Sequence, residues 1–211
     1  MREGYLCLEE VPRVVTPLAK TKINWGKTMA WGEGGYYSRV SLNVKGREPQ
    51  GIIEPEDYEK VRNELKEKLE ALGDETGKPI GTKVYKPQEI YKKCNGIPPD
   101  LVVIFGNLLW RSVGSVGHGK IHTFENDTGP DDANHSQHGI FVMSNLDGTG
   151  EKDLKLNNLH IMDIAPTILS LLGIEAPKDM HGRIIRAEST VYNTDEEEEV
   201  RKRLEALGYI E

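Results

Sequence analysis

Four of the six histidines in this 211-residue chain fall in one glycine-containing stretch that also holds several aspartates. The histidines are His118, His122, His135 and His138, and the aspartates are Asp127, Asp131 and Asp132. Neutral imidazole and ionised carboxylate are donors that Zn, Mn and Fe ions take in proteins. These residue types therefore indicate a candidate metal site. An ordinary loop imidazole, bonded to water or backbone, is the alternative at each position.

The spacing of these histidines does not decide between the two interpretations. Residues four apart share one face of a helix, but Gly119 lies between His118 and His122, and further glycines flank them. We therefore expect no helix to align the two rings. An independent mononuclear site from His118, His122 and His135 with Asp131 stays open as an alternative.

The other short motifs give weaker indications of function. Trp31-Gly-Glu-Gly-Gly35 resembles part of a nucleotide loop, but a strand pattern follows it where a phosphate-binding loop needs a helix, so it favours a turn. Neither a Gly-x-Ser-x-Gly elbow nor a Walker A loop is present. Cys7 and Cys94 have no metal-ligand spacing.

The elements that must position these residues follow from apolar periodicity. An amphipathic helix is predicted from Pro55 to Leu72, since its apolar residues recur every three or four positions and Gly73 follows. A buried helix is predicted over 161–172, with Asp163 as N-cap and Gly173 after its end. Strands are predicted over 36–44, 82–85, 101–105 and 139–143. We expect one domain over 1–211, with a long loop over 106–134 and a terminal helix and tail over 195–211.

Composition narrows the class of partner and the compartment. The net charge is −7, from 27 basic and 34 acidic residues, and no segment carries a Lys/Arg block flanked by aromatic residues, so nucleic acid is not expected as a partner. The longest apolar run, Leu101–Phe105, is far too short to cross a membrane. The N-terminus lacks a secretory signal pattern, so we expect a cytoplasmic protein. Few Gln beside many Glu and Lys favour a thermophilic source.

An ordered set of motifs resembles the C-terminal half of the alkaline phosphatase superfamily, in its type I phosphodiesterase/nucleotide pyrophosphatase, or predicted phosphohydrolase/phosphomutase, branch. The motifs span nearly the whole chain: Gly46-Arg-Glu-Pro-Gln-Gly51, the helix opened by Pro55-Glu-Asp-Tyr-Glu, Val84-Tyr85, Pro99-Asp100, Asn134–Phe141, Asp163–Leu169, Leu172-Gly173, Asp179–Arg183 and Leu207–Tyr209. The resemblance implies an α/β fold, the C-terminal portion of an α/β/α sandwich with a mixed sheet and flanking helices.

The resemblance also implies a site for two divalent metals, Zn or Mn, that act on a phosphoester. Its last histidine ligand corresponds to His135, because Gly139-Ile-Phe141 aligns with the family's Gly-Ile-Phe. His122, His118, His138 and Asp131 remain further candidates. The sequence departs from the family at Ser136, where Arg is common, and at His181, where Asp is usual.

The family's nucleophile and its other metal ligands belong to a segment upstream of the one this chain resembles. We therefore expect a chain that is inactive alone and works with a missing N-terminal half, or a homo-oligomeric binding or assembly module that has lost catalysis. Oligomerisation is expected in both cases, because an apolar face once covered by the missing half would associate.

Overall fold

The computed structural model describes residues 1, 3–91, 93–125, 133–143 and 156–185. Its contacts divide into two compact units, one beginning at Met1 and the other at Ile140, and each is described by itself. The expected terminal helix and tail over 195–211 lie outside the described residues. Within the described part of the chain, no helix has the length and apolar character that crossing a membrane requires.

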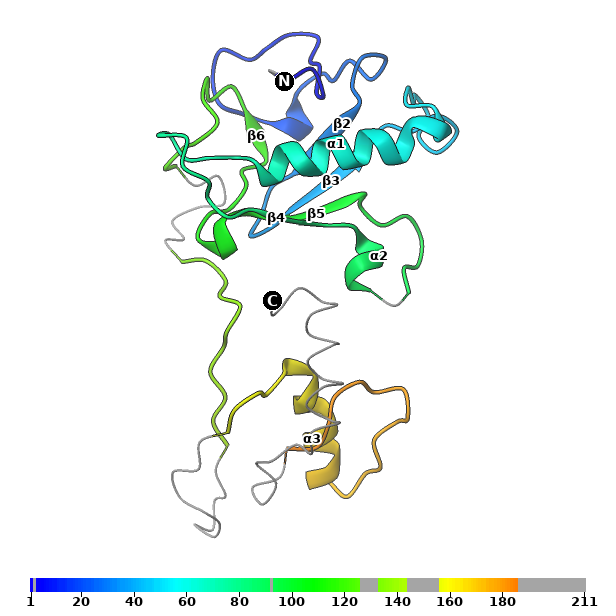
Figure 1. Cartoon of the computed structure of the whole chain (residues 1–211), viewed down its shortest axis with the longest axis vertical. Helices are drawn as coiled ribbons and strands as arrows, with labels where there is room; N and C mark the ends of the chain where they lie inside the picture. Colours follow the sequence, from blue (N-terminus) through cyan, green and yellow to red (C-terminus); the bar gives the residue numbers. More distant parts are fainter. Residues whose placement is uncertain (2, 92, 126–132, 144–155, 186–211) are drawn as a thin grey trace. The chain divides into compact units, whose positions relative to one another are not determined.

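A four-stranded sheet forms the centre of the first unit (Figure 1). Its strands run in the order β2, β3, β5, β4, and all three pairings are antiparallel. Their bounds are Ala30–Glu33 for β2, Ser38–Leu42 for β3, Lys83–Tyr85 for β4 and Leu101–Ile104 for β5. A second, two-stranded antiparallel sheet pairs β1, Thr16–Pro17, with β6, Ser115–Val116. The chain is therefore mixed α/β, but the expected mixed sheet is wrong for these strands.

The unbroken apolar run of β5 does not arise from a position in a parallel sheet. β5 is an inner strand, bonded to β3 on one side and β4 on the other. Leu101 and Val103 are fully buried, whereas Val102 and Ile104 on the other face are half-buried. An inner antiparallel strand whose second face is partly covered gives the same unbroken apolar run as a strand of a parallel sheet.

The predicted amphipathic helix is confirmed as α1, Tyr58–Glu70, entered through a 3₁₀ turn over Pro55–Asp57. Figure 1 shows α1 running along the sheet, and it contacts β4 and β5. Leu65 is its buried apolar anchor. The core beneath it is aliphatic and comes mostly from the sheet: Ala30, Val40, Leu42, Val44, Ile53, Leu65, Val84, Leu101 and Val103.

The remaining short elements of the first unit are 3₁₀ turns and one brief helix. They comprise Leu18–Lys20, the helix α2 over Pro87–Ile90, and the turn Phe105–Leu108 that leaves β5. That last turn has three successive left-handed residues, with φ of 53° at Gly106, 54° at Asn107 and 68° at Leu108. Left-handed backbone is costly for a residue such as Leu, so this turn is held by its surroundings.

The second unit contains a 3₁₀ turn over Ile161–Asp163 and the helix α3, Ile164–Leu171. The predicted helix is confirmed, and so is Gly173 after its end. Gly173 has a φ of 69°, its N–H donates to Ser170 and that of Ile174 donates to Leu169, which is a Schellman motif. The predicted burial is wrong, since Ile168, Leu171 and Leu172 are 51%, 70% and 67% exposed.

Two further expectations, for residues 139–143 and for Asp163, need correction. Residues 139–143 form no strand, and Ile140 and Val142 are exposed, because a strand needs a bonded neighbour and the described residues supply none there. Asp163 does not cap α3 with its side chain. Its buried carboxylate instead accepts from the N–H groups of His160 (2.8 Å) and Arg183 (3.0 Å), so it joins the residue before the 3₁₀ turn to a residue 20 positions after Asp163.

Candidate functional site

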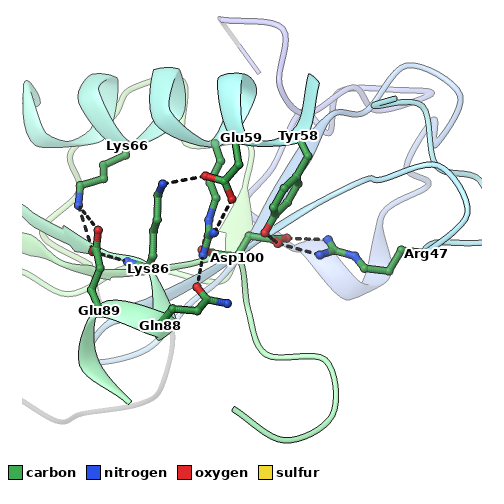
Figure 2. A network of polar contacts seen from close by, with 9 residues as sticks. Arg47, Tyr58, Glu59, Lys66, Lys86, Gln88, Glu89 and Asp100 are labelled. Atoms are coloured by element: carbon green, nitrogen blue, oxygen red, sulfur yellow. Dashed lines mark hydrogen bonds and ion pairs between the residues drawn. The ribbon is translucent and has the colours of Figure 1, made fainter. Parts of the chain in front are cut away.

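The carboxylate of Asp100 is the centre of a polar network beneath α1 (Figure 2). Asp100 precedes β5 and is 2% exposed. Its Oδ1 accepts from Arg47 Nη1 (2.8 Å) and the Tyr58 hydroxyl (2.6 Å), and its Oδ2 accepts from Arg47 Nη2 (2.7 Å) and the Leu42 N–H (2.6 Å). A carboxylate offers about four acceptor positions, and all of them are used. Asp100 is therefore a structural group with no capacity left for a metal or a substrate.

The charges of this network support one another. Burial by itself would raise the pKa of Asp100, but the hydrogen bonds from Arg47, Tyr58 and the Leu42 amide outweigh it and lower that pKa below its usual value. The bond to Asp100 in turn raises the pKa of Arg47. Burial and the bond to Asp100 raise the pKa of Tyr58 to about 12. The network thus holds an ionised carboxylate, a guanidinium and a neutral phenol.

Arg62 extends the network from α1 to α2. It is 4% exposed, and its guanidinium donates to the Asp100 carbonyl (2.9 Å), to Gln88 (2.9 Å) and to Glu59 (3.0 Å). Lys86 completes this link by donating to Glu59 (2.8 Å), as Figure 2 shows. Because one buried arginine of α1 bonds both to the residue before β5 and to α2, it fixes the position of the helix over the sheet.

A different cluster forms where the β2–β3 connection meets the segment after β5. Gly35 and Ser112 exchange two backbone hydrogen bonds, of 2.8 and 3.0 Å. In an antiparallel bridge, the residue after Gly35 lies opposite the residue before Ser112, so Tyr36 is paired with Arg111. The Arg111 Cζ accordingly lies 4.8 Å from the centre of the Tyr36 ring.

A glycine makes this close approach possible. A Cβ at Gly34 would collide with the backbone of Val113 and Gly114. The Trp31–Gly35 motif thus comprises the end of β2 and the start of its connection to β3, and its second-last glycine allows the backbone of 112–114 to pass against it. The sequence alone showed a turn here, but not the segment that packs on it.

His135 is the third member of this cluster, which we call the Tyr36 corner: Tyr36, Arg111, Asn134 and His135. The His135 ring centre lies 3.9 Å from that of Tyr36, with 34° between the planes. Asn134 holds the segment in place, because its Oδ1 accepts from the His135 N–H (2.9 Å) and its Nδ2 donates to the Leu108 carbonyl. The left-handed turn that leaves β5 thus presents the carbonyl that anchors His135.

The other candidate ligands lie elsewhere. His118 Nε2 is 2.9 Å from the Ser115 hydroxyl, His122 packs against Trp110 with ring centres 5.3 Å apart, and His138 is exposed. Asp131 lies outside the described residues, as do Asp127 and Asp132. Among the residues the structure describes, no three His, Cys, Asp or Glu side chains gather closely enough to hold a metal ion. These residues therefore do not make a complete metal site, and the described histidines do not converge.

Sequence reasoning missed Tyr36 and Arg111. The only sequence signal was the pair of glycines before Tyr36, which indicates close backbone approach without identifying the partner. His135 had been selected by resemblance, and the structure adds its two neighbours. An imidazole, a phenol and a guanidinium in one cluster can bind an anion or contribute one nitrogen ligand to a metal.

Comparison with known proteins gives one short match. A stretch of 37 residues is 49% identical to the 2,3-bisphosphoglycerate-independent phosphoglycerate mutase of Bacteroides thetaiotaomicron, a member of the alkaline phosphatase superfamily. The match covers 18% of this chain and 7% of the mutase. No family model and no solved structure matches the chain. The chain is therefore a partial homologue of one member of that superfamily.

Proposed function

We propose that this chain is the C-terminal part of a divalent-metal-dependent enzyme that acts on phosphoesters, of the phosphodiesterase/nucleotide pyrophosphatase type. His135 supplies one metal ligand, and residues outside the described part of the chain supply the others. The observation that carries the proposal is the 37-residue match to a phosphoglycerate mutase. The ordered motifs from Gly46 onward agree with it.

The position of His135 supports this role. Its side chain is exposed, so an incoming ligand can reach it, and its backbone is anchored through Asn134. A ligating histidine needs a fixed backbone and an accessible ring nitrogen. The bound ion would polarise the phosphoryl oxygens, as divalent metals do in enzymes of this kind. The described residues contribute orientation of the imidazole and a nearby guanidinium.

Hydrolysis of bis-p-nitrophenyl phosphate with added Zn²⁺ or Mn²⁺ tests the proposal. We expect no turnover above background by the chain alone, since one histidine cannot hold two ions. Co-expression with any polypeptide encoded immediately upstream is expected to give turnover. His135→Ala should then lower kcat/KM by about 100-fold or more.

His138→Ala is the matched control, because His138 is an exposed histidine three residues away that bonds only through its backbone N–H to Ser136 (3.3 Å) in the described contacts. Its activity should stay within about threefold of the unchanged protein. Turnover that survives His135→Ala would contradict the proposal, and so would robust turnover by the chain alone.

A second candidate is a non-catalytic module that assembles with itself. The specific observation is the exposed apolar surface of the second unit, where Ile168, Leu171 and Leu172 lie on and next to α3. Exposed apolar residues in such number commonly mark an interface. Sedimentation of the intact chain tests it: Leu171→Ser should shift an oligomer towards monomer, whereas Ser170→Ala should not.

A further inference from the structure

We infer that Asn95 is a site of spontaneous deamidation, through a succinimide that its side chain forms with the backbone nitrogen of Gly96. The two residues lie in the loop that leads from α2 to β5 (Figure 1). They are the only Asn-Gly pair in the sequence. This modification site goes beyond the proposed function and does not depend on it.

The reaction needs no enzyme, because both reacting groups belong to the chain. The Gly96 nitrogen attacks the Asn95 Cγ, the new C–N bond closes a cyclic imide, and the bond from Cγ to Nδ2 breaks. Ammonia leaves and carries away the proton of the Gly96 nitrogen. Water then opens the imide at either carbonyl, which gives aspartate or isoaspartate at position 95. Each product adds a negative charge to the loop.

The attacking nitrogen is not held by the fold. The Gly96 N–H has no acceptor in the described part of the chain, and the residue is exposed. Gly96 has a φ of 69°, and a Cβ built there would meet nothing within 4 Å. Glycine has no side chain to hinder its nitrogen, and it changes between left- and right-handed backbone at little cost. The fold therefore offers little resistance to the rotation that the attack requires.

The side chain of Asn95 is also accessible and unbonded. It is exposed and makes no hydrogen bond to any residue that the structure describes. The Tyr91 N–H donates to Pro87 before it and the Asp100 N–H donates to Val40 after it, but no described residue between Tyr91 and Asp100 takes part in a backbone hydrogen bond. Exposed segments without backbone bonds move at little cost in free energy. The loop can thus bring the Asn95 Cγ to the nitrogen of the next residue.

Two other asparagines have both reacting groups held by hydrogen bonds. Asn43 is buried, and its Nδ2 donates to three backbone carbonyls. The N–H of Val44, which would have to attack Asn43, donates to Leu42 (3.1 Å). The Oδ1 of Asn134 accepts from the His135 N–H (2.9 Å), which is the nitrogen that would attack there. Both sites must open locally before they can react, whereas Asn95 need not.

Incubation of the intact chain at mildly alkaline pH, folded and in guanidinium chloride, tests the inference. Peptide mass spectrometry measures the replacement of NH₂ by OH at each asparagine, and an isoaspartyl carboxyl methyltransferase with S-adenosylmethionine labels the isoaspartate. The ratio of unfolded to folded rate removes the intrinsic effect of the following residue. Folding should slow Asn95 by less than about fivefold and Asn134 by at least about tenfold. A larger slowing at Asn95, or equal slowing at both, would overturn the inference.

Two variants test the reacting pair. Gly96→Ala should lower the rate at Asn95 by at least about tenfold, because the methyl group hinders the nitrogen and restricts the backbone. Asn95→Gln should remove the product, since glutamine would have to close a larger ring. Gly77→Ala is the matched control: Gly77 is also exposed, with a φ of 85° and open space at its Cβ position, so the rate at Asn95 should change by less than about twofold. Far-ultraviolet circular dichroism checks that each variant is folded. An unchanged rate in Gly96→Ala, or methyl label that persists in Asn95→Gln, would contradict the site.

Discussion

Tyr58 and Tyr36 each have arginine over the ring, but the two contacts lie in different surroundings. At Tyr58, the Cζ atoms of Arg47 and Arg62 lie 5.7 and 5.4 Å from the ring centre, and the phenol donates to a buried carboxylate. At Tyr36, one arginine lies over the ring. The difference is the third partner, which is Asp100 in the first case.

The third partner at Tyr36 is His135, an exposed imidazole on a segment tied by Asn134. A carboxylate with four donors cancels the arginine charge and closes the network of Tyr58. At the Tyr36 corner the third partner is an imidazole, which is not a fixed negative charge, so the contact seen there is between rings and a guanidinium. Arginine over tyrosine therefore belongs to a buried ion-pair network at Tyr58 and to a ring cluster with an exposed histidine at Tyr36.

Removal of the Asp100 charge should break the Tyr58 network most severely. Asp100→Asn removes the buried negative charge that pairs with Arg47 and replaces one of its acceptor oxygens with a donor, so we expect a loss of about 3–5 kcal/mol in the free energy of unfolding. Urea unfolding followed by circular dichroism measures it. Glu54→Gln breaks the exposed Lys45–Glu54 pair and should cost less than about 1 kcal/mol. A loss below about 1 kcal/mol in Asp100→Asn would contradict the structural role.

The same variant has a pH signature. The pKa of Asp100 is lower in the folded protein than in the unfolded chain, so its contribution is present above the unfolded pKa of about 4 and is lost as pH falls through the folded pKa. The unchanged protein should lose stability in that acid range. Asp100→Asn should lose less there, because it has no such group to protonate.

The close backbone contact beneath the Tyr36 corner gives the next largest effect. Gly34→Ala adds a Cβ that collides with backbone at Gly114, so the two segments must separate, at a cost of about 3 kcal/mol. The His135 ring signals should move with them. Gly139→Ala is the control, since a Cβ there meets nothing within 4 Å. Unchanged His135 signals in Gly34→Ala would show that the bridge does not position the corner.

Removal of the Tyr58 hydroxyl tests how much one hydrogen bond contributes to the Asp100 network. Tyr58→Phe removes the 2.6 Å bond to Asp100 and should cost about 1.5 kcal/mol. In the unchanged protein, the phenol should ionise with a pKa of about 12, so its contribution persists below pH 10 and disappears as pH rises towards 12. Ultraviolet difference titration detects it as a late phase absent from the variant. A phenol that titrates near pH 10 would contradict the buried network.

The smallest effect on stability is expected at Tyr36. Tyr36→Leu should change the free energy of unfolding by about 0.5 kcal/mol, because the corner is near the surface, yet it should shift the His135 ring protons by removing the ring current. Urea unfolding and NMR give the two values. A large loss of stability without a change in the His135 chemical shifts would contradict this prediction. It would show that Tyr36 contributes to the stability of the fold and not to the position of His135.

Local pattern was enough for the helices. The spacing of Tyr58, Val61, Leu65 and Leu69 predicted α1, and Gly173 predicted the end of α3, because each depends on neighbours within one turn. Apolar runs were less reliable. Residues 101–105 contain a strand and residues 139–143 do not, since strand formation depends on a partner that no short window of sequence reveals.

The candidate site was likewise only partly predictable from the sequence. Resemblance selected His135, and residue type made His118 and His122 candidates, but the structure gives each of the three a different neighbour. Asp131 lies outside the described residues, so its candidacy stays a prediction. The metal role of His135 also stays a prediction, as do partner and compartment.

By itself, the sequence determined the elements whose causes are local: the amphipathic helix α1, the helix α3 with its glycine terminus, and the histidine-rich stretch. Tertiary structure decided which of two tyrosines packs against the core. Arg47 and Asp100 are 53 residues apart, and Tyr36 and His135 are further apart still. Hydrogen bonds and ring contacts over such separations depend on how the sheet brings segments together, and no local pattern encodes that arrangement.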